Sequence, residues 1–229
     1  MIEDPPLIRL RRRFSRPDAA TLAALRGLPT GFAVDAMDGR GALAAAIKPL
    51  PDTPPALCGV ALTCEAGPAD NLAVFTAMAV AQPGDVIVAA VVAFAATAVT
   101  GDLLMGMMRN RGVAGFVTDG MVRDIAGIVA VGLPCFCAGV TPNSPVRNGP
   151  GTVGLPVVVG GVAAESGDVV IGDADGVVIV PRAAFAAVTA RLAAIRRAEA
   201  ELDARVKGGL TIPEWLDEFV ASGRIREVD

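Results

Sequence analysis

Two glycine-containing turns hold residue types that suit metal-assisted chemistry on a carboxylate. Each turn follows an expected strand and opens an expected helix, at residues 100–104 (TGDLL) and 118–124 (TDGMVRD). Ligands of open α/β sheets collect beyond the carboxyl ends of the strands, and a helix start offers free N–H groups to an anion. We therefore expect Asp102 and Asp124 to face one crevice, with Arg123 beside them.

These groups form a plausible site for a divalent cation bound together with a small carboxylate. Mg²⁺ prefers carboxylate and water ligands, and Gly101 lets a ligand approach the backbone closely. The spacing alone leaves a structural interpretation open as well. Aspartate often caps a helix N-terminus, and neighbours such as Arg123 and Asp124 often form a surface ion pair.

The composition narrows the chemistry further. The 229 residues contain no histidine, which excludes Ser-His-Asp and Cys-His catalysis, phosphohistidine transfer and His-ligated zinc. The only lysines, Lys48 and Lys207, do not follow apolar strand ends, so a Schiff-base lysine is not expected. The net charge of −4 argues against a nucleic-acid partner, whose binding surfaces are normally basic.

The cysteines and the chain ends indicate a cytoplasmic protein without a membrane segment. The four cysteines form no C-x-x-C pair and are expected to be reduced and buried. Residues 1–17 carry acidic residues and then five arginines, without an apolar segment, and are predicted to form a flexible N-terminal arm. The longest apolar run, between Asp85 and Asp102, is shorter than the roughly 18–20 residues that span a bilayer.

Alternating elements in the middle of the chain position the two turns. The helix that opens at residues 70–71 is expected to bury Leu72, Phe75 and Met78. We predict one α/β domain over residues 1–229. Its expected strands are 57–64, 85–92, 113–118 and 134–138, followed by β segments over 153–180 and by C-terminal helices over 182–229.

The two turns resemble the hallmark of the class II pyruvate aldolases, the 4-hydroxy-4-methyl-2-oxoglutarate/4-carboxy-4-hydroxy-2-oxoadipate aldolase branch of the RraA-like family. That hallmark is an aspartate, twenty residues and then Arg-Asp, which matches Asp102, residues 103–122 and Arg123-Asp124. The joint pattern is more specific than any single motif, and the resemblance covers about residues 30–185. Further similar blocks are Asp35-Ala36, 59–63 (GVALT), 70–72 (DNL), 83–85 (PGD), 139–142 (GVTP) and 175–177 (DGV).

The resemblance implies substrate-binding and catalytic roles in the turns. Arg123 would hold the pyruvyl group and stabilise the enolate oxygen. The backbone N–H groups of Leu103 and Leu104, which follow Gly101, would bind the pyruvyl carboxylate. Asp102 would orient a metal-bound water that carries a proton.

The resemblance also implies a metal site, a fold and an assembly. Asp124 would bind Mg²⁺ or Mn²⁺, with Asp102 acting through water and Glu199 arriving from the C-terminal helix of a neighbouring subunit. The fold would be an αββα sandwich resembling the swivelling phosphohistidine domain, with a helical C-terminus. The assembly would be a homotrimer or a dimer of trimers.

The implied activity is a divalent-metal-dependent lyase that cleaves a 4-hydroxy-2-oxo acid to pyruvate through a metal-stabilised enolate. Decarboxylation of oxaloacetate gives the same enolate and is the implied side activity. Two alternatives stay open: a non-enzymatic regulator of ribonuclease activity that binds a protein partner, and a related 2-oxo acid decarboxylase. Many family members place glycines before the first turn, where residues 93–98 (AFAATA) stand here, so Phe94 could narrow the pocket or shift its specificity.

Overall fold

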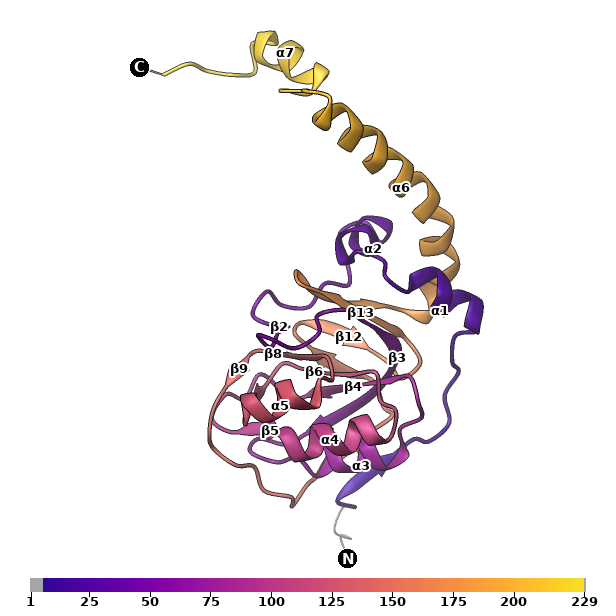
Figure 1. Cartoon of the computed structure of the whole chain (residues 1–229), viewed down its shortest axis with the longest axis vertical. Coiled ribbons are helices and arrows are strands. Elements are labelled where there is room, and N and C mark those ends of the chain that lie inside the picture. Colours follow the sequence, from indigo (N-terminus) through magenta and orange to yellow (C-terminus); the bar gives the residue numbers. More distant parts are fainter. Residues whose placement is uncertain (1–5, 229) are drawn as a thin grey trace, which may run out of the picture.

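A nine-stranded mixed sheet lies at the centre of the computed structural model, which describes residues 6–228 (Figure 1). Four neighbouring strands of this sheet, at residues 57–66, 85–90, 115–118 and 135–137, run parallel, as the alternating strand and helix signals predict. Across the sheet the strands are β1 (Ile8–Leu10), β10 (Gly151–Val153), β3 (Leu57–Ala66), β4 (Asp85–Ala90), β6 (Gly115–Thr118), β8 (Cys135–Cys137) and β2 (Lys48–Pro49), while β13 (Val169–Asp173) joins β3 to β14 (Gly176–Val180).

Three helices connect the parallel strands and cover one face of the sheet (Figure 1). They are α3 (Leu72–Val80), α4 (Asp102–Asn110) and α5 (Ile125–Val131). Every residue of β4 is buried, because helices cover one of its faces and further strands cover the other. The expected core face of α3 is confirmed only in part: Phe75 and Met78 pack against the core while partly exposed, Ala79 is exposed, and the fully buried residues are Ala73, Val74 and Ala77.

A second layer of strands and a second group of helices lie beyond the other face. The hairpin of β11 (Val157–Val159) and β12 (Val162–Ala164) packs on the sheet and forms an apolar cluster with it. Strands β13 and β14 separate this cluster from a second apolar cluster, which they form with the outer helices. The outer helices are α1 (Ala19–Leu25), α2 (Thr30–Ala36) and the start of α6. The order is therefore helix, strand, strand, helix, and the α/β class is confirmed; the likeness to swivelling phosphohistidine domains stays a prediction.

The C-terminus is helical, as predicted, and projects from the body of the fold. The 3-10 turn η1 (Arg182–Ala184) leads into α6 (Phe185–Lys207), whose Val188 and Leu192 are buried, and α7 (Glu214–Ala221) follows. Ile195 still packs against the body; the rest of α6 projects away from it, and α7 lies near the far end of α6 (Figure 1). No helix within residues 6–228 is both long and apolar enough to cross a membrane.

The prediction of a flexible arm over residues 1–17 is wrong for the part that the structure describes. Residues 7–16, which we call the strap, include β1, which pairs in parallel with β10. At the end of the strap, both terminal nitrogens of Arg16 contact the carboxylate of Asp85, whose side chain is fully buried. Strand β1 was not predicted because a strand of three residues is too short to show an alternating pattern. An arginine-rich sequence is also typical of a solvated segment. Residues 1–5 lie outside the described residues.

The four cysteines are free thiols, as predicted. Cys64, Cys135 and Cys137 are buried, and Cys58 is partly exposed. Burial raises the pKa of the Cys64 thiol to about 12, so this thiol is uncharged at neutral pH and behaves as a small apolar side chain.

Candidate functional site

A separate three-stranded parallel sheet brings the two chemical turns together. Its strands are β5 (Ala98–Thr100), β7 (Met121–Val122) and β9 (Gly139–Val140). Thr100 pairs with Val122, so both strands end at one edge, and the backbone N–H of Arg123 donates to the Thr100 carbonyl at 3.1 Å. The residues that follow the two strands, Gly101-Asp102 and Arg123-Asp124, are therefore neighbours in space.

The first turn opens helix α4, whose free N–H groups face the site. Gly101 is the N-cap, and Asp102 is the first helical residue. The backbone N–H of Leu103, one of the two expected substrate donors, bonds the Asp102 Oδ1 atom at 2.7 Å. A carboxylate ligand can therefore use the Leu103 N–H only after the Asp102 side chain turns away from it.

The second turn holds an ion pair in a conformation that is unusual for a non-glycine residue. Asp124 precedes α5 with a φ of 61°, in the left-handed region, where aspartate is tolerated better than most residues. Its side chain makes no capping hydrogen bond, so the structural interpretation of Asp124 as a side-chain helix cap is wrong, whereas the alternative of an exposed ion pair between Arg123 and Asp124 is confirmed. The Arg123 Nε atom lies 3.1 Å from Asp124 Oδ2, and Arg123 Nη1 also contacts the hydroxyl of Ser144.

A cavity of about 180 Å³ lies where the two turns meet. The structure brings together every predicted site residue except Glu199, which lies on the exposed part of α6. A single chain does not test a Glu199 role that belongs to a neighbouring subunit. The lining consists of Gly101, Asp102, Leu103, Leu104, Arg123 and Asp124, together with Asn71, Phe75, Thr100, Met107, Ser144, Pro145 and Arg147.

Three polar residues of this cavity, Asn71, Ser144 and Arg147, were not assigned to the site by the sequence analysis. The guanidinium of Arg147 stacks on the Phe75 ring, 4.9 Å from its centroid, and makes no ion pair within residues 6–228. Asn71 is 4% exposed; its Nδ2 donates to the Val99 carbonyl at 3.1 Å, while its Oδ1 has no hydrogen-bond partner. A buried acceptor without a partner costs free energy, which favours a ligand donor at this atom. Asn71 belongs to the DNL block, whereas Arg147 lies in a stretch without any periodic signal.

The donor set suits a hard cation that keeps part of its water shell. Asp102 and Asp124 both line the cavity, and carboxylate oxygens are the ligand type that Mg²⁺ prefers. In this structure Asp102 Oδ1 accepts from the Leu103 N–H and Asp102 Oδ2 lies against Gly127, so Asp102 must rotate to reach an ion directly. Among residues 6–228, no group of three or more His, Cys, Asp or Glu side chains could hold a metal ion. The described residues therefore offer an ion at this cavity no more than these two carboxylates.

A larger cavity, of about 710 Å³, lies elsewhere and suits this chemistry less well. It is mostly apolar, and both carboxylate oxygens of Asp119 are taken by the backbone N–H groups of Val91 and Ala93, at 2.8 and 3.1 Å. Val92 and Ala93 line this cavity, whereas no residue of 92–98 lines the 180 Å³ cavity. The expectation that Phe94 narrows the candidate site is therefore wrong.

Gly101→Ala is expected to lower activity at this site by at least about tenfold while the protein stays folded. A Cβ atom there would lie 2.6 Å from Asp124 Oδ2 and 3.2 Å from Arg123 Cγ, so the ion pair must shift, and sub-ångström misplacement of reacting groups is costly. Gly106→Ala, in the same helix, is the control, because its Cβ would have 3.8 Å of clearance. Turnover and melting temperature are measured for both; equal turnover would contradict the assignment.

Comparisons with known proteins agree with the resemblance of the turns. The family model described as "RraA-like: Aldolase/RraA" matches residues 30–179. A protein of Halalkalibacterium halodurans named "Putative 4-hydroxy-4-methyl-2-oxoglutarate aldolase" is 39% identical over 168 residues, which are 73% of this chain and 80% of the relative.

Solved structures share the fold. A structure of an uncharacterized protein from Pseudomonas syringae pv. tomato has a TM-score of 0.74 at 24% identity, covers 86% of this chain and 97% of its own, and shows a likeness of fold alone. Streptomyces coelicolor RraAS2, described as "an unusual member of the RNase ES inhibitor RraA protein family", has a TM-score of 0.72 at 28% identity over 84% of this chain and 100% of its own. The chain belongs to the RraA-like family, within its aldolase branch.

Proposed function

We propose that this protein is a divalent-metal-dependent lyase that cleaves a 4-hydroxy-2-oxo acid to pyruvate. The observation that carries the proposal is the cavity in which one helix N-terminus, two carboxylates and the Arg123 guanidinium meet. The name of the Halalkalibacterium halodurans relative supports an aldolase. Such a reaction needs positive groups where charge develops as the carbon–carbon bond breaks, and Arg123 is suited to that role.

In the proposed reaction the start of α4 binds the substrate carboxylate through the N–H of Leu104, and of Leu103 once Asp102 releases it. Arg123, oriented by Asp124 and Ser144, faces the 2-oxo oxygen. When the bond between C3 and C4 breaks, its electron pair moves toward that oxygen and gives the enolate of pyruvate. The 4-hydroxyl loses its proton as it becomes a carbonyl, and C3 later gains one; Asp102, acting through water, moves these protons.

Asp124, and Asp102 through water, would hold Mg²⁺ or Mn²⁺ in this site. When bound, the ion supplies positive charge beside the oxygens of the 2-oxo acid. We further propose Glu199 of the partner subunit as an additional ligand, because one chain offers only two carboxylates here.

The projecting C-terminal helices support self-association, and we propose that the assembly is a homotrimer or a dimer of trimers. Helix α6 has 23 residues and is therefore about 35 Å long. Leu202, Trp215 and Val220 lie on the projecting part and are 48%, 62% and 57% exposed, an apolar surface that a second copy of the chain would cover. Light scattering is expected to give a mass of three or six chains of 23.2 kDa each. A stable monomer would contradict the proposed assembly.

We assign Arg147 and Asn71 to the half of the substrate that leaves as the second product. Arg147 carries an unpaired charge within residues 6–228, which fits a second carboxylate, and the Asn71 Oδ1 acceptor fits the 4-hydroxyl group. Arg147→Gln is expected to raise KM by at least about tenfold for a substrate with this carboxylate, since hydrogen bonds to charged groups contribute about 1.5–3 kcal/mol. Arg109→Gln, outside the cavity, is the control. An unchanged KM would contradict the assignment.

A pyruvate-release assay over 4-hydroxy-2-oxo acids and oxaloacetate tests the proposed activity. Release from oxaloacetate is expected as a side activity, because its decarboxylation leaves the same enolate. Release from oxaloacetate but from none of the hydroxy acids would favour a 2-oxo acid decarboxylase. Absence of release from every substrate, with Mg²⁺ or Mn²⁺ present, would contradict the lyase.

The likeness to Streptomyces coelicolor RraAS2 supports a second candidate, a regulator of ribonuclease activity that binds a protein partner. This candidate predicts no pyruvate release and saturable inhibition of a ribonuclease. Variants of Arg123 would leave that inhibition unchanged if the regulator binds its partner through another surface. In a lyase the same variants would abolish pyruvate release.

A further inference from the structure

A second polar cavity, of about 220 Å³, shares no lining residue with the candidate active site. The strap forms one wall, and the loop after β10, the turn between β12 and β13 and the start of η1 form the others. Three of its lining residues are arginines. The lining residues are Arg11, Arg13, Phe14, Ser15, Gly154, Pro156, Glu165, Ser166 and Arg182.

The strap holds two of these arginines on a fixed backbone. The N–H of Arg11 donates to the Val153 carbonyl at 2.8 Å. A side chain at Gly154 would overlap the Arg11 carbonyl, and one at Gly167 would overlap the Ser15 carbonyl, so both glycines let the strap lie directly on the body. Together with the ion pair that ends the strap, these contacts fix where Arg11 and Arg13 leave the backbone.

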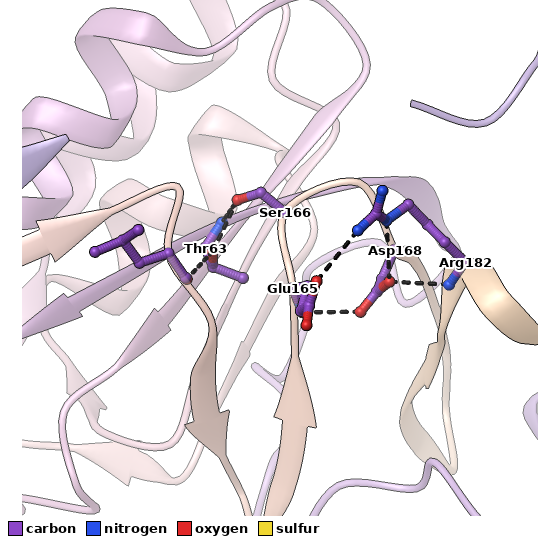
Figure 2. Close-up of polar contacts among 6 residues, drawn as sticks. Thr63, Glu165, Ser166, Asp168 and Arg182 are labelled. Carbon is purple, nitrogen blue, oxygen red and sulfur yellow. Dashed lines mark hydrogen bonds and ion pairs between the residues drawn. The ribbon is translucent and has the colours of Figure 1, made fainter. Parts of the chain in front are cut away.

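The third arginine is fixed from the opposite wall (Figure 2). The backbone N–H of Arg182 donates to Asp168 Oδ1 at 2.9 Å, and its Nη2 donates to Glu165 Oε2 at 3.1 Å. The Glu165 N–H in turn donates to Asp168 Oδ2 at 2.8 Å. The Arg182 Nε atom is buried, has no hydrogen-bond partner and lies 3.9 Å from Asp168 Oδ1.

The Ser166 hydroxyl at the cavity has no proton left to donate to a ligand. The Thr63 hydroxyl donates to the Leu155 carbonyl at 2.6 Å, so its contact with Ser166 Oγ at 2.8 Å must be donated by Ser166 (Figure 2). Ser166 Oγ also accepts from the Thr63 N–H at 3.0 Å. The only proton of Ser166 is therefore used, so the side-chain donors of the lining that are left to a ligand are the guanidinium groups and the Ser15 hydroxyl.

The charges around the cavity favour an anion. Three arginines face two carboxylates, Glu165 in the lining and Asp168 beside Arg182, which leaves a local charge of +1 in a chain whose formal net charge is −4. Within residues 6–228, Arg11 and Arg13 take part in no ion pair. Guanidinium groups match the oxygens of phosphate through paired N–H donors.

We propose that this cavity binds a small oxyanion of the phosphate class, held by Arg11, Arg13 and Arg182. Its volume is below the 300–1,000 Å³ typical of sites for larger ligands, so the bound group is phosphate itself or the terminal phosphate of a monoester. Glu165 sets the strength of binding, because it competes for the Arg182 guanidinium.

Calorimetry with inorganic phosphate, and separately with glycerol phosphate, tests the proposal on the full chain at low ionic strength. We expect saturable binding with a Kd of about 1 mM or tighter. Arg11→Gln and Arg13→Gln should each weaken binding by at least about fivefold, since each removes a charged donor. Arg12→Gln is the matched control, because Arg12 is outside the lining. Glu165→Gln should tighten binding.

The comparison of variants separates this cavity from other positive surfaces. An equal loss in the Arg11, Arg12 and Arg13 variants would overturn the proposal in favour of diffuse surface charge. Loss of phosphate binding in Arg147→Gln, with no loss in the strap variants, would place the anion in the candidate active site and would also overturn it. Absence of saturable binding for both anions would do the same. Melting temperatures confirm that each variant is folded.

Discussion

Arg123→Lys is expected to lower turnover for pyruvate release by at least about 100-fold, with little change in melting temperature. The guanidinium is held by Asp124 and Ser144 at the edge of the cavity, and its planar fork can stabilise the charge that develops on the 2-oxo oxygen. Lysine keeps the charge but has neither the fork nor the same reach. Loss of one such donor typically costs two to three orders of magnitude in turnover.

Arg109→Lys is the matched control for this prediction. Arg109 lies at the end of α4, where its Nη1 contacts the Val131 carbonyl outside the cavity. Turnover and melting temperature are measured for both variants in the presence of Mg²⁺. A folded Arg123→Lys protein with turnover close to that of Arg109→Lys would refute the catalytic role of Arg123.

Arg16→Gln is expected to destabilise the protein by about 3–5 kcal/mol, the usual cost of leaving one member of a buried ion pair alone. Asp85 is fully buried at the start of β4, and besides Arg16 only the Gln82 N–H, at 2.8 Å, bonds its carboxylate. The Arg16 side chain is 29% exposed, so its loss uncovers one side of the carboxylate. Denaturant unfolding measures the change.

Arg12→Gln serves as the control for stability, because Arg12 is exposed and in no ion pair within residues 6–228. Its free energy of unfolding should stay within about 0.5 kcal/mol of the wild-type value, as for most surface substitutions. If Arg16→Gln is as stable as Arg12→Gln, the strap does not anchor the N-terminal segment to the sheet.

The candidate site could largely be predicted from the sequence, because its key residues lie in two short turns that both lead from a strand into a helix. Parallel strands end at one edge, so the turns that follow them must be neighbours. From the sequence, this rule was applied to the expected strands 85–92 and 113–118, which became β4 and β6 of the main sheet. The strands that directly precede the turns, β5 and β7, belong to a separate sheet and were not predicted, because they have only three and two residues.

Long-range contacts could not be predicted. Arg147 reaches the cavity from an irregular segment, and its partner Phe75 looked like a core residue of α3. The sheet instead receives Ala73 and Ala77, because small side chains let the helix pack closely, and Phe75 is left at the margin. The strap was missed for a similar reason: its arginines are typical of solvated chain, and the buried partner Asp85 lies 69 residues away.

The most direct test of the central claim is pyruvate release from metal-stripped protein as Mg²⁺ is titrated back, for the wild type and for Asp124→Asn. Asparagine tolerates the left-handed backbone at residue 124, so the variant should fold, but a neutral amide is a weaker ligand for a hard cation. We predict no release without metal, saturable recovery in the wild type and no recovery in Asp124→Asn over the same range. Full release in the presence of chelator, or identical titrations for the two proteins, would contradict a metal-dependent lyase at Asp124.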